Sequence, residues 1–127
     1  MQVLVVEDNP LVQRLVPPVL EKALGQVEVR SARSLEEAFE LLAHHPAPDF
    51  AVLDLGLPGH TGVDTLRRFR WKFPRIPVVV FSVTEDPASV RVAREMGAIA
   101  YIPKSLNAEK FVAAIQQVVR DGSFFPS

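Results

Sequence analysis

The chain has 127 residues, a formal net charge of −1 and no cysteine. That length is enough for one domain with a real hydrophobic core, and 48% apolar with 23% charged residues is typical of a soluble globular protein. The near-zero net charge argues against direct nucleic-acid or membrane binding by this segment, and the lack of cysteine excludes disulfides and thiolate chemistry. The apolar runs are too short to span a membrane and no signal peptide follows Met1, so we expect a cytoplasmic protein.

Five short apolar runs, rich in β-branched or aromatic residues, alternate with helix-like stretches. The expected strands are residues 3–6, 27–30, 50–53, 77–81 and 99–102. Their near-continuous apolarity predicts strands that helices cover on both faces, as in a parallel sheet. Five β-strand and α-helix units in alternation indicate an α/β fold, a doubly wound parallel sheet with right-handed crossovers.

Capping residues mark where the helices begin and end. The start signals are Asn9-Pro10, the capping box from Ser34 to Glu37, and Asp86-Pro87, while Gly97 and Gly122 mark two helix ends. Further helices are expected over 63–73 and about 107–121, the second with one apolar stripe. Pro17-Pro18 interrupts the first helical pattern, because two proline nitrogens cannot donate to the preceding turn, and we expect a kink or a broken hydrogen-bond ladder there.

Polar residues follow four of the five strands. Parallel strands end at one edge of a sheet, so these residues are expected to meet there. They are Glu7 and Asp8 after the first strand, Asp54 after the third, Ser82 after the fourth and Lys104 after the fifth. Carboxylates in close quarters should bind a hard cation such as Mg²⁺, and a lysine and a serine can hold phosphoryl oxygens. The set therefore predicts a phosphoryl-transfer site.

Asp54 is the best candidate for the nucleophile at this site. It stands alone on the central strand, and the chain has no cysteine and no histidine in a matching place. Simpler interpretations exist for each residue alone: an acidic pair can be a solvated loop start, and Tyr101 on the last strand can be ordinary packing. The combination at matching strand ends favours the site.

The pattern resembles the response-regulator receiver family over essentially the whole chain. The matching segments are Glu7-Asp8-Asn9, then Asp54-Leu55-Gly56-Leu57-Pro58-Gly59 with Gly62, then Ser82, and then Tyr101-Ile102-Pro103-Lys104-Ser105. The resemblance implies a flavodoxin-like sheet of strand order 2-1-3-4-5. It also implies a signalling domain rather than an enzyme, one that takes part in its own phosphorylation and dephosphorylation. The implied donor is a sensor histidine kinase, and a homodimer on phosphorylation is a further expectation.

The resemblance also implies a role for each site residue. Asp54 would be the phosphoacceptor, and Mg²⁺ would be held by Asp8, Asp54 and the Gly56 carbonyl, with Glu7 acting through water. Lys104 would pair with the phosphoryl group. Ser82 would move toward that group while Tyr101 rotates inward, which repacks the face formed by the fourth helix, the fifth strand and the fifth helix.

Residues 97–105 and the helix ending at Asp121-Gly122 resemble the NarL/LuxR-like subgroup, whose receivers precede a DNA-binding domain. We therefore expect a receiver domain over 1–122 and, over 123–127, the start of a linker to an output domain outside this chain, which regulates transcription. A stand-alone receiver is the other interpretation, and truncation is favoured because the tail stops where a linker would begin.

Two departures from the family pattern bear on function. Val83 stands where the family usually has Ala or Gly, so its bulk is expected to crowd the pocket and slow phosphorylation by small donors, hydrolysis, or both. Pro17-Pro18 lies in the helix on which partner kinases usually dock. These features keep one alternative open, a pseudo-receiver that binds proteins independently of phosphorylation. A nucleotide-binding enzyme is disfavoured, because Glu7-Asp8-Asn9 occupies the turn where a glycine-rich loop would lie. A dehalogenase-like phosphatase is disfavoured too, because it should carry a nucleophilic aspartate on the first strand with a second aspartate two residues on.

Overall fold

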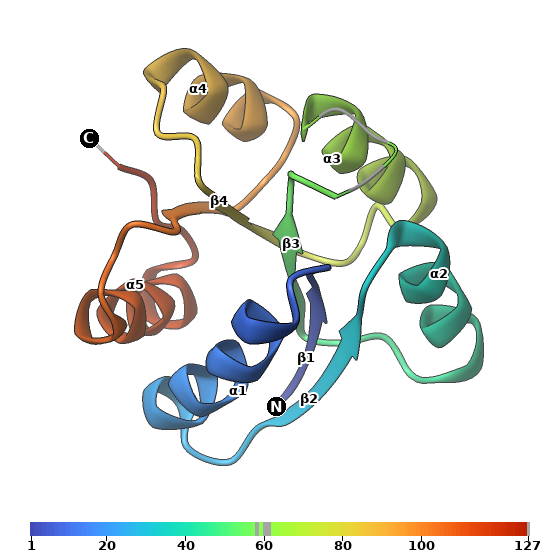
Figure 1. The fold of residues 1–127 in the computed structure, drawn as a ribbon, viewed down its shortest axis with the longest axis horizontal. Coiled ribbons are helices and arrows are strands. Elements are labelled where there is room, and N and C mark those ends of the chain that lie inside the picture. The colour runs from blue at the N-terminus through green and yellow to red at the C-terminus, as the bar shows by residue number, and fades with distance from the viewer. Residues whose placement is uncertain (58, 60–61, 127) are drawn as a thin grey trace.

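The computed structural model describes residues 1–57, 59 and 62–126, so Pro58 of the Asp54 motif and Ser127 of the expected linker lie outside it. Five parallel strands form one sheet in the order β2-β1-β3-β4-β5, and the expected topology is confirmed (Figure 1). The strands are β1 (Gln2–Val6), β2 (Glu28–Ala32), β3 (Phe50–Asp54), β4 (Val78–Ser82) and β5 (Ala100–Pro103). The helices are α1 (Pro10–Leu24), α2 (Leu35–His44), α3 (Gly62–Lys72), α4 (Pro87–Glu95) and α5 (Ala108–Asp121).

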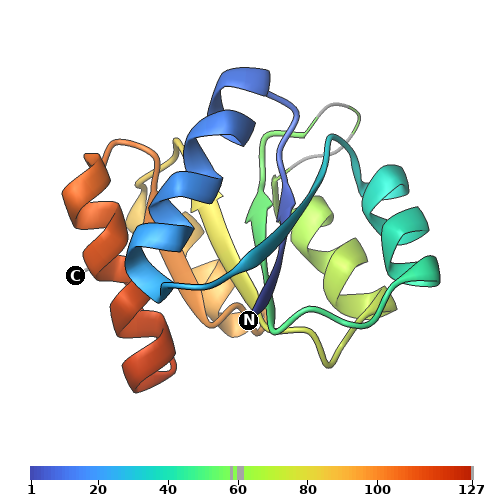
Figure 2. The same cartoon turned by 90° about the horizontal axis from the view of Figure 1, so that it is seen from below.

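Helices cover both faces of the sheet, with α1 and α5 on one side and α2, α3 and α4 on the other (Figures 1 and 2). Each face has its own apolar core. The α1–α5 core joins Val16 and Leu20 of α1 to Phe111 and Ile115 of α5. The α2–α4 core includes Leu35, Leu66, Phe69, Ala93 and Tyr101.

The position of a strand in the sheet explains its composition. Every residue of β3 and β4 is buried, as the continuous apolar runs predict for strands covered on both faces. The edge strand β2 is largely exposed or half-buried, and there Arg30 donates to the Glu28 carboxylate at 3.0 Å. The buried central strands therefore support the polar residues at their C-terminal ends.

The helix α1 continues through Pro17 and Pro18, so it does not end there, although the two prolines leave its hydrogen-bond ladder without two donors as expected. Asn9 caps its start, accepting from the Leu11 N–H at 2.9 Å. Val16 and Leu20 on either side of the prolines are fully buried. Tertiary packing thus holds the helix together where two backbone donors are missing by chemistry.

The segment after α5 is folded against the sheet, although a linker was expected from residue 123 onward. The Tyr101 N–H donates to the Phe124 carbonyl at 2.8 Å, and the Phe124 N–H donates to the Ile99 carbonyl at 3.3 Å. The folded unit therefore continues past the expected boundary at residue 122. Among the described residues, no helix has the length and apolarity needed to cross a membrane.

Candidate functional site

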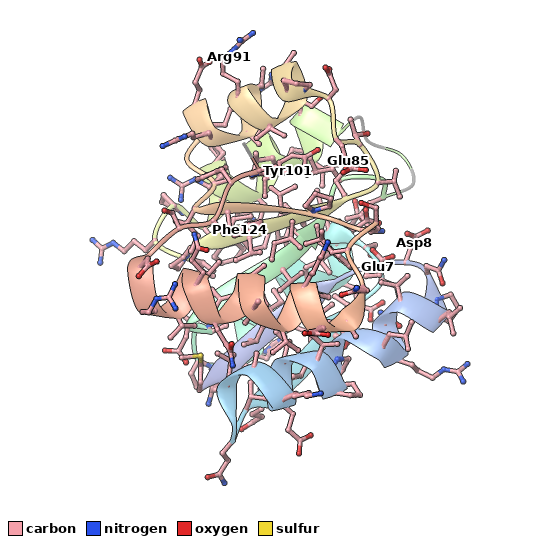
Figure 3. The ribbon with its side chains drawn as sticks, turned by 90° about the vertical axis from the view of Figure 1, so that its left-hand side faces the viewer. Glu7, Asp8, Glu85, Arg91, Tyr101 and Phe124 are labelled. Atoms are coloured by element: carbon pink, nitrogen blue, oxygen red, sulfur yellow. The ribbon has the colours of Figure 1, made fainter. Side chains whose placement is uncertain are left out.

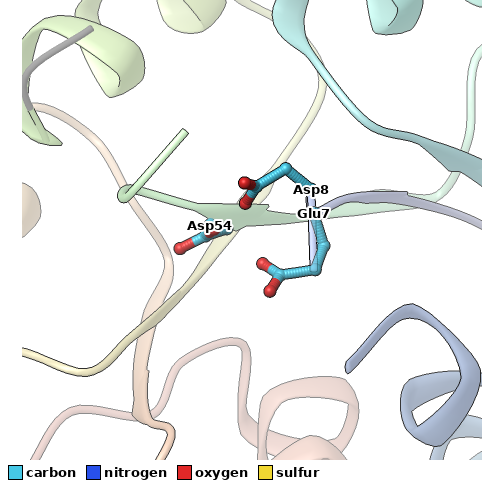
Figure 4. Close-up of side chains that lie close together, drawn as sticks. All are labelled: Glu7, Asp8 and Asp54. Carbon is cyan, nitrogen blue, oxygen red and sulfur yellow. The ribbon is translucent and has the colours of Figure 1, made fainter. Parts of the chain in front are cut away.

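The polar residues expected at one edge of the sheet do meet there. Glu7 and Asp8 follow β1, Asp54 ends β3, Ser82 ends β4 and Lys104 follows β5. Figure 4 shows the carboxylates of Glu7, Asp8 and Asp54 pointing toward a common space. The Glu7 N–H donates to the Ala32 carbonyl at 2.9 Å, and the Lys104 N–H donates to the Ser82 carbonyl at 2.8 Å. These bonds continue the sheet ladder and fix the backbone beneath the site.

The three carboxylates form a tight acidic cluster. One oxygen from each of Glu7, Asp8 and Asp54 lies within 4.8 Å of the others. Glu7 and Asp54 are buried, with 1% and 5% of their surface exposed. Burial raises the pKa of Glu7 to about 7, helped by a hydrogen bond with Asp54 and opposed by Lys104. Near neutral pH, Glu7 is therefore divided between its neutral and charged forms.

Lys104 joins two of these carboxylates. Its Nζ lies 3.0 Å from Glu7 Oε1, 3.1 Å from Glu7 Oε2 and 3.2 Å from Asp54 Oδ1. The same Nζ lies 5.4 Å from the centre of the Phe81 ring, and the side chain is 17% exposed. A compact ammonium is thus held beside Asp54, where it can pair with an anionic group attached there.

The turn after Asp54 leaves space beside the carboxylate. The Gly56 N–H donates to Asp54 Oδ1 at 2.9 Å. A Cβ at position 56 would lie 3.5 Å from Asp54 Oδ1, an ordinary van der Waals contact. The predicted metal ligand is the Gly56 carbonyl, whereas the contact present is through its N–H, so that role stays a prediction.

Ser82, Thr84 and Tyr101 form a second group beside Asp54. The Ser82 Oγ accepts from the Thr84 N–H at 3.2 Å. Tyr101 is fully buried, and its hydroxyl donates to the Thr84 carbonyl at 2.7 Å. Tyr101 therefore already holds the inward position that was expected to follow rotation. Sequence reasoning missed Thr84 as its partner, because a backbone carbonyl has no residue-type pattern that could reveal it.

A cavity of about 370 Å³ opens between these two groups. Asp54 and Ser82 line it together with Tyr101 and Val83. Val83 is 76% exposed, so its side chain stands at the mouth of the cavity rather than deep beside Asp54. The cavity gives a small phosphorylated donor room to approach the Asp54 carboxylate, and the expected effect of Val83 on rates stays a prediction.

The chemistry of the acidic cluster fits a divalent cation. Mg²⁺ prefers carboxylate oxygens and retains several waters, and the half-buried Asp8 beside two buried carboxylates places three such ligands together. Glu7, Asp8 and Asp54 are the residues that would hold the ion. It would neutralise charge on a phosphoryl group at Asp54.

A parallel α/β sheet with carboxylates and a lysine at the C-terminal ends of its strands defines a phosphoryl-binding class of domain. The sequence pattern of the family described as the response regulator receiver domain matches residues 3–116, and the chain belongs to that family. Receiver domains are phosphorylated by sensor histidine kinases and typically bind Mg²⁺ at an acidic pocket.

Several transcription regulators resemble this chain. It is 30% identical to the glycerol metabolism activator of Pseudomonas putida, over 98% of this chain and 57% of that protein. It is 33% identical to the transcriptional regulatory protein PhoP of Escherichia coli K12, over 97% of this chain and 54% of that protein. The chain thus spans about half the length of the curated relatives it matches.

Solved structures agree with the fold. A LuxR family DNA-binding response regulator from Silicibacter pomeroyi superimposes with a TM-score of 0.83 at 26% identity, covering 100% of this chain and 97% of that one. The phosphorylated cyanobacterial phytochrome response regulator RcpA superimposes with a TM-score of 0.77 at 27% identity, covering 99% and 98%. The expected receiver fold is therefore confirmed.

Proposed function

We propose that Asp54 accepts a phosphoryl group from a phosphohistidine of a sensor histidine kinase in a Mg²⁺-dependent reaction, and that this modification switches a protein-binding surface. The observation that carries the proposal is the position of Lys104, whose Nζ lies 3.2 Å from Asp54 Oδ1 at the edge of the acidic cluster. The reaction is proposed for the cytoplasm, where a kinase that consumes ATP works.

The transfer exchanges one bond for another. An Asp54 carboxylate oxygen attacks phosphorus, and the new O–P bond forms as the P–N bond of the phosphohistidine breaks. The electron pair of that bond returns to the imidazole nitrogen, which takes a proton. Asp54 then carries an acyl phosphate with a charge of about −1.5 to −2, in place of the single negative charge of the carboxylate. Hydrolysis of this acyl phosphate returns the carboxylate and inorganic phosphate.

Protein groups position and neutralise the transferred group. Lys104 exchanges its contact with Asp54 for a phosphoryl oxygen, a charge-assisted hydrogen bond. Ser82 donates its hydroxyl hydrogen to a second phosphoryl oxygen, and its backbone bond with Thr84 changes as it moves. Thr84 also accepts from the Tyr101 hydroxyl, so this movement reaches β5 and α4.

The output is proposed to be transcriptional. The relatives named above are an activator and a transcriptional regulator, each about twice as long as the matched region. A DNA-binding output domain that responds to the switching surface, and dimerisation on phosphorylation, follow as parts of the proposal. The segment itself, with a net charge of −1, is not proposed to bind DNA.

Intact mass spectrometry after treatment with acetyl phosphate and Mg²⁺ tests the core of the proposal. We expect the wild type to gain one phosphoryl group and Asp54→Asn to gain none. Asp49→Asn is the matched control, because Asp49 is an exposed aspartate at the opposite end of the same strand. A wild type that gains no phosphoryl group would support the pseudo-receiver alternative instead.

A further inference from the structure

The C-terminal residues 123–126 form an edge strap, a segment that lies along the open edge of β5. The helix α5 ends at Gly122, whose φ of 88° is a conformation that glycine adopts without strain and that turns the chain back toward the sheet. The Phe124 carbonyl accepts from the Tyr101 N–H at 2.8 Å, and Phe124 forms a parallel bridge with Ala100. Figure 3 labels both residues, Tyr101 above and Phe124 below it.

The edge strap also packs on both faces of the sheet. Phe124 contacts the α1–α5 core, and Phe125 contacts the α2–α4 core on the opposite face. Successive side chains on opposite faces are what a β-strand produces. The Arg94 guanidinium of α4 lies 4.7 Å from the centre of the Phe125 ring, a cation–π contact. The edge strap is therefore an extended segment joined to β5 by one isolated bridge, and Phe125 links it to α4.

Phe125 stands where it can restrict Tyr101. Both side chains belong to the α2–α4 face, and Tyr101 is fully buried with its hydroxyl on the Thr84 carbonyl. β4 pairs with one side of β5, so an outward turn of Tyr101 leads toward the other side, the open edge. The edge strap covers that edge, and Phe125 with Arg94 lines the groove of about 210 Å³ between α4 and the strap.

We propose that the edge strap holds Tyr101 in its inward position, because Phe125 beneath Arg94 closes the route by which the tyrosine ring would leave. A partner that displaced the strap would release Tyr101 and loosen its contact with Thr84. The inference deepens the proposed function, since it rests on that proposal for the signalling role of Tyr101. The restraint itself depends on packing and does not require phosphorylation.

Tyr101 is the only tyrosine in the sequence, so fluorotyrosine labelling gives a single ¹⁹F resonance. We expect Phe125→Ala to move this resonance toward the solvent-exposed position and to increase the exchange rate of the Tyr101 amide hydrogen by at least tenfold. Phe125→Leu should restore most of the wild-type behaviour. Lys22→Ala is the control, because it removes an exposed cation of α1 that does not line this groove.

All spectra are recorded before any phosphoryl donor is added, and also on Asp54→Asn, so the result does not depend on whether Asp54 accepts a phosphoryl group. An unchanged Tyr101 resonance in a Phe125→Ala protein whose Tyr101 amide has lost protection would overturn the proposal. An amide that stays protected in that variant would also overturn it, because Phe125 would then not hold the strap. If Phe125→Ala does not fold, Arg94→Ala at an exposed position gives the same two readouts.

Discussion

The acidic cluster and the corner formed by β4, α4 and β5 are built from different kinds of interaction. In the cluster, charged side chains meet directly, and Lys104 lies within 3.2 Å of oxygens from both Glu7 and Asp54. At the corner, backbone groups of Thr84 link the side chains: its N–H donates to the Ser82 hydroxyl, and its carbonyl accepts from the Tyr101 hydroxyl. The proposed chemistry at Asp54 thus depends on residue types, whereas its proposed transmission depends on the path of the backbone.

Replacing Lys104 should have the largest effect on the cluster. We expect Lys104→Met to slow phosphorylation by acetyl phosphate by roughly 10²-fold, because removing one fixed hydrogen-bond donor to a developing negative charge in an enzyme site costs about 2.7–4 kcal/mol. Phosphorylation followed by intact mass over time measures the rate. Lys110→Met, which changes an exposed lysine of α5, is the control and should react at the wild-type rate.

The raised pKa of Glu7 makes stability depend on pH. Below its unfolded value of 4.5 the carboxyl is neutral in both states, and between 4.5 and about 7 the folded state retains a proton that the unfolded state has lost. The Glu7 contribution is therefore full at low pH and is lost as pH rises through about 7. At about 1.4 kcal/mol per pKa unit it amounts to at most about 3.5 kcal/mol.

Urea unfolding with EDTA, from pH 4 to pH 8, measures this contribution. The free energy of unfolding of the wild type should fall with rising pH relative to Glu7→Gln, which cannot lose a proton. A difference between the two proteins that stays constant with pH would show that Glu7 titrates normally. Glu109→Gln, at an exposed position of α5, should follow the wild type.

Mg²⁺ binding should release a proton from the same carboxyl. A cation favours the charged form of Glu7, so the apparent affinity for Mg²⁺ should rise between pH 6 and 7 and level off above, by up to about tenfold per pH unit. Titration calorimetry in buffers of different ionisation enthalpy measures the proton released. Asp8→Asn should weaken binding at every pH, and equal heats in all buffers would contradict the linkage.

The smallest effect is expected at Val83. Its side chain is 76% exposed at the mouth of the cavity, so Val83→Ala should raise the rate of phosphorylation by acetyl phosphate or of hydrolysis by about threefold, less than 1 kcal/mol of barrier. Intact mass followed over time with the donor present gives the phosphorylation rate, and after its removal the hydrolysis rate. If neither rate changes, the crowding attributed to Val83 is absent.

The sequence predicted the cluster better than the corner for a physical reason. Glu7, Asp54 and Lys104 follow apolar strand-length runs, and parallel strands necessarily end together. The strand bounds fall within two residues of those expected. The sequence did not predict that α1 continues through Pro17 and Pro18, because this continuity depends on the packing of the buried residues Val16 and Leu20.

The corner depends on backbone partners that no residue type identifies. The hydrogen bond from Tyr101 to the Thr84 carbonyl and the pairing of Phe124 with β5 form only in the folded structure. Residues 123–126 have no helical pattern, which is equally typical of a linker and of a short edge strand. The expected boundary at 122 marked the end of α5 and not the end of the folded structure.

The edge strap also bears on how this protein behaves at high concentration. An unpaired strand edge is a template for pairing with another molecule, and sheets protect their edges with charges or with covering segments. At β2 the charged pair Glu28 and Arg30 provides the first kind of protection, while Phe124 and its neighbours provide the second at β5. Loss of the strap would therefore expose the unpaired edge of β5 to pairing with other molecules. By packing on the two cores, Phe124 and Phe125 keep this edge covered and so oppose aggregation.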